Sequence, residues 1–201
     1  MKRALGISLV VLIVLSAAAQ APAQTQKLAP LKPALVVIDI QNAFLPDMSE
    51  SDVKAALPAI NECLNFFRSN GLPIIRVYHT DPAEGPKPGT KEFEYPDTAA
   101  VKPGDPKVIK NYPNGFKKTD LDKILKDKGC NTLFLCGLSA TGCVLATYRG
   151  ALDLDYDAFL IRGAVIGPEA SQTKAVLDIC QSVDGASLLV MIKAALYEAK
   201  K

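Results

Sequence analysis

The chain has 201 residues, enough for one domain to bury a hydrophobic core without support from a metal or disulfides. It carries 23 Lys and Arg against 21 Asp and Glu, and the charges balance once Lys2 and Arg3 of the amino-terminal segment are set aside. A net charge of zero gives no electrostatic reason to propose nucleic acid or an anionic membrane as a partner, so we expect a small-molecule substrate and neither of those partners.

The amino-terminal segment has the layout of a secretory signal peptide. Lys2 and Arg3 precede an apolar run at 4–19, and small residues follow as far as Ala23. We predict a signal peptide at 1–23, a flexible leader at 24–33 and one folded domain at 34–201. The alternative is an uncleaved membrane anchor, but the run is shorter than the roughly 20 residues of a spanning helix. The protein is therefore expected to be exported, to the periplasm or out of the cell, with no membrane partner after cleavage.

The first half of the mature chain predicts three strands and one helix. A β-branched run at 34–40 predicts a buried strand closed by Asp39, and a second strand is expected at 73–80. Between them, Pro58 is expected in the first turn of a helix, where its missing N–H costs nothing. The apolar stripe of that helix consists of Leu57, Ile60, Leu64 and Phe67. A proline-rich loop at 81–106, which we interpret as a lid, a pocket wall or an oligomer contact, precedes a short strand at 107–110.

The second half continues the alternation. It predicts helices at 119–130, 142–153 and 168–183, strands at 131–137, 157–164 and 186–191, and a final helical turn at 193–200. Strands that alternate with helices in this way are typical of a parallel sheet covered on both faces. We therefore expect an α/β fold with three layers, α/β/α, around a six-stranded, mainly parallel, Rossmann-like sheet, and no second domain.

Three reactive side chains follow the ends of predicted strands: Asp39, Lys110 and Cys143. In parallel sheets, ligands bind beyond the carboxyl ends of the strands, near the point where the strand order reverses. Each residue alone has an ordinary structural explanation, as a turn residue, a solvated lysine or a buried thiol. Together they form a chemical unit, because a helix N-terminus and an ammonium stabilise a thiolate while a carboxylate accepts its proton.

The cysteines allow two interpretations. There are five, Cys63, Cys130, Cys136, Cys143 and Cys180, and in an oxidising compartment four of them can pair in three ways. Free cysteines, in contrast, are usually buried as small apolar residues. The sequence alone does not choose between bridges and free thiols.

Three motifs resemble those of the isochorismatase-like superfamily of cysteine hydrolases. They are VVIDIQNAFL with Asp39, VIKNYPNGF with Lys110 and GLSATGCVLAT with Cys143, and the similarity begins at about residue 33 and covers nearly all of the mature chain. The resemblance implies the same six-stranded sheet and a catalytic triad of these three residues. It also implies a cis peptide bond between Leu138 and Ser139 that aims the Ser139 and Cys143 N–H groups at an oxyanion.

The same resemblance bears on metals and chemistry. Nicotinamidase-like members hold a metal with an aspartate and several histidines, whereas His79 is the only histidine of this chain, so we predict no metal and no cofactor. Ala140 and Thr141 depart from the commonest family pattern and are nearer to that of carbamoyl-amide hydrolases. Members that cleave isochorismate, a vinyl ether, lack the cysteine, so Cys143 favours attack on an acyl carbon.

Several side chains near the motifs are expected to contact the substrate. These are Gln41, Phe44, His79, Tyr112, Asn114, Phe116 and Tyr148. A hydrogen-bonded structural role is an equal alternative for His79, and a solvated loop position is an equal alternative for Tyr112 and Asn114.

The sequence therefore predicts a metal-independent cysteine hydrolase that cleaves the C–N bond of a small amide, carbamoyl or ureido compound through a thioester. One alternative is a non-catalytic binding protein on the same scaffold. Another is a redox-active thiol protein in which Cys136 resolves Cys143. The resemblance also implies a homo-oligomer rather than a single subunit.

Overall fold

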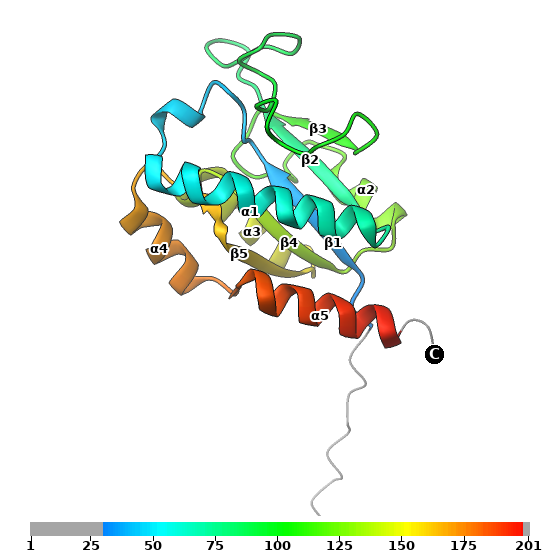
Figure 1. The fold of residues 1–201 in the computed structure, drawn as a ribbon. Helices are drawn as coiled ribbons and strands as arrows, with labels where there is room; N and C mark the ends of the chain where they lie inside the picture. The colour runs from blue at the N-terminus through cyan, green and yellow to red at the C-terminus, as the bar shows by residue number, and fades with distance from the viewer. Residues whose placement is uncertain (1–29, 199–201) are drawn as a thin grey trace, which may run out of the picture.

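The computed structural model describes residues 30–198, which form an α/β domain around one six-stranded sheet (Figure 1). The strands lie in the order β3-β2-β1-β4-β5-β6, and all five pairings are parallel, which confirms the predicted architecture. The predicted signal peptide and residues 24–29 of the leader lie outside the described residues. The strand bounds are β1 Pro33–Ile38, β2 Ile74–His79, β3 Lys107–Lys110, β4 Thr132–Leu138, β5 Asp157–Ile166 and β6 Ser182–Val183.

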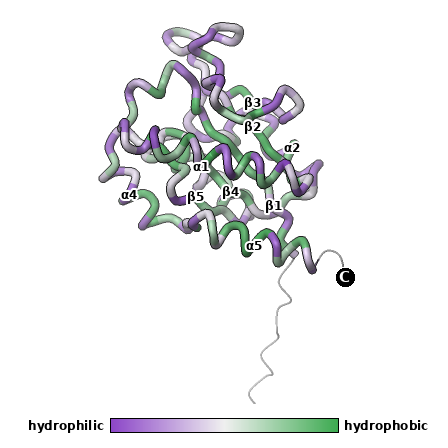
Figure 2. The backbone as a smooth tube through the Cα atoms, viewed as in Figure 1, coloured by the Kyte–Doolittle hydropathy of each residue, from purple (hydrophilic) through white to green (hydrophobic). Residues whose placement is uncertain are grey.

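Helices cover both faces of the sheet. Helices α1 (Glu50–Ser69) and α5 (Gly185–Glu198) pack on one face, and α1 lies in front of the strands in Figure 1. Helices α2 (Leu121–Asp127), α3 (Leu145–Leu152) and α4 (Ala170–Ile179) pack on the other. Figure 2 shows the apolar strands between the helices and many hydrophilic residues in the outer loops.

Strand β1 shows why the central sequence runs are apolar throughout. All six of its residues are buried. Ala34, Val36 and Ile38 join the core on one face, while Leu35 and Val37 join the core on the other. A central parallel strand has no solvent-facing side, so it needs an apolar residue at every position.

Helix α1 begins at Glu50, so the prediction that Pro58 lies in the first turn is wrong. Ser49 is the N-cap, and its hydroxyl accepts a hydrogen bond from the Asp52 N–H. A proline inside a helix removes the N–H that would bond to the carbonyl four residues earlier, which here belongs to Lys54. Pro58 and Lys54 are both exposed, so water can satisfy that carbonyl.

The predicted strand at 186–191 is also wrong, because these residues belong to α5 and the sixth strand is Ser182–Val183. Asp184 favours the helix because its carboxylate accepts hydrogen bonds from the first helical turn. Leu188 and Ile192, spaced as on one helix face, are the buried residues of α5. Although α5 is rich in apolar residues, no helix in the described part of the chain has the length and hydropathy to cross a bilayer.

The strand order determines where a site can form. The chain runs from β1 outward to β2 and β3, and then returns to place β4 on the other side of β1. The segments that leave β1 and β4 at their carboxyl ends therefore diverge and leave a crevice between them. Asp39 follows β1, while Ser139 and the π-helical turn η2 (Ala140–Val144) follow β4.

The proline-rich segment at 81–106 contains no strand or regular helix, as predicted. Its second part is tied to the chain that follows β1, because the Asn42 N–H donates to the Glu94 carbonyl and the Ala43 N–H to the Glu92 carbonyl. Its first part, 81–90, is largely exposed. The anchored part of the loop therefore stands beside the carboxyl end of β1.

Candidate active site

Asp39 is placed by the end of β1. Its N–H donates to the Val77 carbonyl of the neighbouring strand, and its own carbonyl accepts from the Gln41 N–H. A φ of 51° turns the chain out of the strand. Aspartate tolerates this left-handed conformation better than most residues, but it still costs of order 1–3 kcal/mol. The turn leaves Asp39 only 1% exposed, at the edge where the crevice forms.

Lys110 joins Asp39 to Cys143. Its ammonium lies 2.6 Å from Asp39 Oδ2 and donates to Cys143 Sγ at 3.1 Å. Strand β2 separates β3 from β1, and neighbouring strands lie about 4.8 Å apart, so a long side chain is needed to span the gap. Lys110, like Asp39, is 1% exposed, which shields the ion pair from water. The structure thus brings the three predicted residues together.

Cys143 lies in the turn η2 and not at the start of a regular helix. Gly142, with φ −112° and ψ −108°, interrupts helical geometry before α3 begins. The peptide bond between Leu138 and Ser139 is cis, as the resemblance implied. The Ser139 carbonyl accepts a hydrogen bond from the Gly142 N–H, which folds the chain back over the end of β4 and directs Cys143 toward Lys110.

All five cysteines are free thiols, and Cys143 is partly exposed whereas the other four are buried. Cys136 is fully buried in the core on the α1 face, while Cys143 packs against the core on the opposite face. A bridge between these two residues would require the sheet to open. The structure therefore argues against Cys136 as a resolving thiol.

The pKa values of the thiol and the carboxylate are both shifted. Burial raises the pKa of Asp39 to about 6, although the Lys110 ammonium opposes the rise. Burial, followed by the negative charge of Asp39, raises the pKa of Cys143 to about 12. The Lys110 ammonium lowers the pKa of this thiol, as expected, but burial and the Asp39 charge outweigh it in the resting site. Cys143 needs a base, and an Asp39 oxygen lies within 4.8 Å of its sulfur.

Three potential metal ligands occupy the same place. One donor atom each from Asp39, His79 and Cys143 lie within 4.8 Å of one another, and carboxylate, imidazole and thiolate are ligands that zinc accepts. Here the Lys110 ammonium fills the space between them, 3.1 Å from His79 Nδ1 and in contact with the other two. The cation of this site is thus part of the chain, and these residues do not fit a resident metal.

Gln41 and Phe44 surround His79. The Gln41 side chain donates to the His79 carbonyl at 3.0 Å and accepts from the His79 N–H at 2.7 Å. Gln41 is fully buried, so it fixes the end of β2 instead of facing a substrate as predicted. The Phe44 and His79 rings lie 6.0 Å apart between centroids, and His79 Nδ1 lies 3.1 Å from the Lys110 ammonium.

Two of the residues predicted after Lys110 hold their loop against the fold. The Asn114 side chain accepts from the Phe116 N–H and packs against Gly150, where an added Cβ would lie 2.4 Å from the Asn114 amide nitrogen. Phe116 stacks on Tyr156 with ring centroids 5.9 Å apart. These contacts give Asn114 and Phe116 packing roles.

Tyr112 and Tyr148 are engaged in a similar way. The Lys117 and Lys118 ammonium groups lie 4.3 Å and 5.5 Å from the centroid of the Tyr112 ring. Tyr148 is 3% exposed, and its hydroxyl accepts from the Gln181 N–H. Within residues 30–198, no hydrogen bond, ion pair or ring contact joins either tyrosine to the triad.

Tyr95 is a residue of this region that sequence reasoning missed. Its hydroxyl lies 2.9 Å from the Val37 carbonyl and 2.6 Å from the Val77 carbonyl, directly below the strand ends that carry the site. Burial, with smaller contributions from neighbours that include Asp39, raises the pKa of Tyr95 well above its ordinary value. The signal in the sequence was the pair Phe93 and Tyr95, two aromatic residues in an otherwise polar loop.

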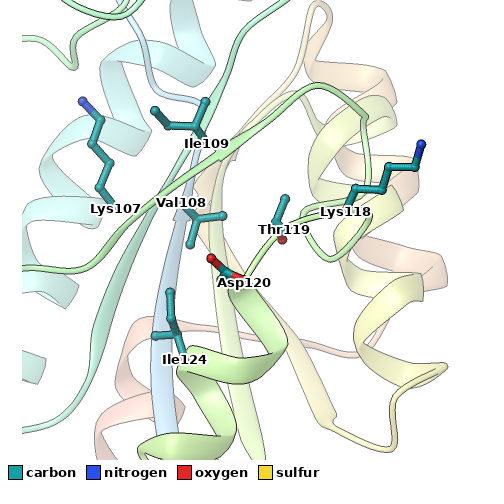
Figure 3. Close-up of a pocket in the computed structure, with 7 residues that line it drawn as sticks. All are labelled: Lys107, Val108, Ile109, Lys118, Thr119, Asp120 and Ile124. Atoms are coloured by element: carbon teal, nitrogen blue, oxygen red, sulfur yellow. The ribbon is translucent and has the colours of Figure 1, made fainter.

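A hollow of about 330 Å³ lies beside β3, but it is not the site of the triad (Figure 3). β3 is an edge strand, and the lining comes from its first three residues, from the residues just before α2 and from one residue of α2. The Lys110 side chain reaches Asp39 instead and does not line this hollow. The lining residues are Lys107, Val108, Ile109, Lys118, Thr119, Asp120 and Ile124.

The chain is similar to several known proteins. A family model described as the isochorismatase domain matches residues 33–184. The secreted isochorismatase effector Isc1 of Verticillium dahliae is 33% identical over 134 residues, which cover 65% of this chain and 70% of that protein. The ureidoacrylate amidohydrolase RutB of Azorhizobium caulinodans is 28% identical over 186 residues, covering 73% of this chain and 82% of that protein.

A solved structure gives the same result at the level of the fold. The crystal structure of N-carbamoylsarcosine amidase from Thermoplasma acidophilum superposes with a TM-score of 0.67 at 27% identity, covering 77% of this chain and 95% of that chain. The family match spans most of the chain, and Asp39, Lys110 and Cys143 lie together at the strand ends. This chain is therefore a hydrolase that belongs to the isochorismatase family.

Proposed function

We propose that this protein is a metal-independent cysteine hydrolase that cleaves the C–N bond of a small amide, carbamoyl or ureido compound. The observation that carries the proposal is the buried Lys110 ammonium, 2.6 Å from the Asp39 carboxylate and 3.1 Å from the Cys143 sulfur. The names of two similar proteins, ureidoacrylate amidohydrolase and N-carbamoylsarcosine amidase, support ureido and carbamoyl substrates.

In the proposed reaction the Cys143 sulfur attacks the substrate carbonyl carbon while Asp39 takes the thiol proton. The electrons of the C=O bond move to oxygen, and the backbone N–H groups of Ser139 and Cys143 donate to this oxyanion. When the oxyanion collapses, the C–N bond breaks and Asp39 gives its proton to the departing nitrogen. Water then attacks the thioester carbon, loses a proton to Asp39, and releases the acid as the sulfur regains its proton.

Lys110 supplies the positive charge for these steps. Negative charge passes from the Asp39 carboxylate to the attacking sulfur, and the ammonium contacts both groups. A fixed charge in a buried site interacts more strongly than the same charge in water. Because the ammonium already lies between the available ligand atoms, we propose that no metal or cofactor takes part.

A substrate panel tests the proposed reaction. Small primary amides, carbamates and ureido acids are incubated with the purified protein, and released ammonia is measured. We expect turnover of at least one carbamoyl or ureido compound, with no loss when the protein is treated with a chelator. Activity that disappears with chelation and returns with a divalent metal would contradict the metal-independent mechanism.

The pH profile tests Asp39 as the base. Asp39 accepts a proton only as the carboxylate, and its pKa is raised to about 6 by burial. We therefore expect kcat/KM to be level between about pH 7 and 8 and to fall about tenfold per pH unit well below pH 6. A rate that instead climbs continuously above pH 8 would show that free thiolate, and not Asp39, limits the reaction.

We also propose that the protein is exported and acts on its small-molecule substrate outside the cytoplasm. The basic, apolar and small residues at 1–23 support export, and one similar protein is named a secreted effector. The intact mass of the exported protein tests this, since cleavage after Ala23 leaves Gln24 as the first residue.

The resemblance to the family supports a homo-oligomer, which light scattering in solution tests.

A further inference from the structure

The Lys110 ammonium has three N–H donors and no acceptor. The ammonium donates to Cys143 Sγ and lies 3.1 Å from His79 Nδ1, and it forms an ion pair with Asp39 Oδ2 at 2.6 Å. Because an ammonium can only donate, His79 Nδ1 must be the acceptor, and the imidazole must carry its single proton on Nε2. The ammonium thus has one ion-pair partner, Asp39, and two hydrogen-bond acceptors, Cys143 and His79.

The fold holds His79 in this position from several sides. His79 and Lys110 are paired residues of the neighbouring strands β2 and β3, which lie side by side in Figure 1. The buried Gln41 amide holds both backbone groups of His79, and the Phe44 ring lies against the imidazole. These contacts fix the orientation of the imidazole and therefore the direction in which Nδ1 points.

The surroundings keep this imidazole uncharged. Burial and the Lys110 charge lower the pKa of His79, while Asp81 acts weakly in the opposite direction. The other ionisable groups that face it are Asp39 and Cys143. A neutral His79 can accept a hydrogen bond from an ammonium, whereas a protonated one would repel it.

We propose that His79 is a positioning residue, whose neutral imidazole accepts a hydrogen bond from Lys110 and thereby fixes the ammonium between Asp39 and Cys143. The inference rests on the proposed catalytic function of Lys110 and Cys143. Without this acceptor, one N–H of a buried ammonium has no partner, and Lys110 turns toward another acceptor or water. The sulfur then loses the contact that stabilises its negative charge as it reacts.

The test compares two substitutions of nearly equal shape, His79→Asn and His79→Leu. The Asn side-chain oxygen takes the place of Nδ1 as an acceptor, while Leu offers none. The readout is the rate at which iodoacetamide alkylates Cys143 in the folded protein at pH 8. It is measured by mass spectrometry of the tryptic peptide 129–149, in which the buried Cys130 and Cys136 serve as internal references. This readout requires no substrate, so it remains informative even if no compound in the panel is hydrolysed.

We expect His79→Leu to slow Cys143 alkylation about tenfold, which corresponds to the loss of one hydrogen bond to a charged group, and His79→Asn to stay within about threefold of the unchanged protein. On any substrate found, kcat should fall for His79→Leu with KM nearly unchanged. Equal rates for both variants, whether normal or slow, would overturn the proposal, as would a rise in KM alone, which indicates a substrate contact.

A double-mutant cycle separates positioning from a general effect on the fold. If His79 acts through Lys110, His79→Leu should have no further effect on alkylation in a Lys110→Met protein. Additive losses would overturn the proposal. The midpoint of thermal unfolding is measured for each variant, and Cys136 must remain unlabelled in all of them, since its labelling would report opening of the core.

Discussion

Replacing Cys143 by alanine is expected to lower turnover by at least ~10⁴-fold, since the substitution removes the atom that forms the thioester. The fold should remain intact, because Cys143 is partly exposed and only its sulfur is lost. Ammonia release on the best substrate of the panel measures the effect. Circular dichroism and thermal unfolding check that the variant is folded.

Two further variants make this result specific. Cys130→Ala is the matched control, because it removes the sulfur of a buried cysteine outside the site, and it should keep nearly full activity. Asp39→Asn keeps the shape of the carboxylate but cannot take the thiol proton, so a loss of about 10³-fold is expected. If Cys143→Ala retained the ammonia release of the unchanged protein, the thioester mechanism would have to be abandoned.

Gly137→Ala is expected to destabilise the fold by at least about 4 kcal/mol, which is among the largest effects of a single substitution. Gly137 has a φ of +110°, and an added Cβ would lie 2.0 Å from the Ile38 carbonyl oxygen of the paired strand β1. Backbone cannot move aside cheaply in the centre of a sheet. Urea unfolding, or the yield of soluble protein, measures the loss.

Gly129→Ala is the control that separates collision from backbone conformation. Gly129 also has a positive φ, +67°, but nothing lies within 4 Å of its added Cβ. Only the conformational cost remains there, about 1–2 kcal/mol. Similar losses for the two variants would mean that the close approach of β4 to β1 is not what requires glycine at Gly137.

The parts of the fold that sequence predicted well are those in which each residue has one local environment. The runs at 34–38 and 133–138 have no polar side chain because both faces of β1 and β4 are covered, and such runs mark central strands. Asp39, Lys110 and Cys143 could be placed at one edge because parallel strands all end there. The family motifs then assigned their roles.

The misplaced elements depend on information that a short window does not contain. Pro58 interrupts α1 only on its exposed side, so helix formation before it was visible only through the Ser49 cap. The run at 186–191 is apolar enough for a strand, and what makes it helical is the Asp184 cap and a helical face that meets the core at Leu188.

Site properties that depend on burial were also beyond the sequence. The pKa of Cys143 rises because the thiol is desolvated and lies close to Asp39, and neither depth nor distance can be read from a motif. The predicted contacts Tyr148 and Asn114 are close to the motifs in sequence, but their side chains turn toward the core and Gly150. Proximity along the chain does not determine which way a side chain points.

Tyr95 divides the proline-rich loop into an anchored part and an exposed part, which differ in how well they tolerate sequence changes. The Tyr95 hydroxyl holds the anchored part against the carbonyls of Val37 and Val77. A sequence change in this part therefore disturbs the ends of β1 and β2. The exposed part at 82–90 is mostly in solvent, so we expect that it can be lengthened, shortened or exchanged while Asp39, Lys110 and Cys143 stay where they are. Variation in this exposed part therefore changes the outer surface of the loop and leaves the strand ends in place.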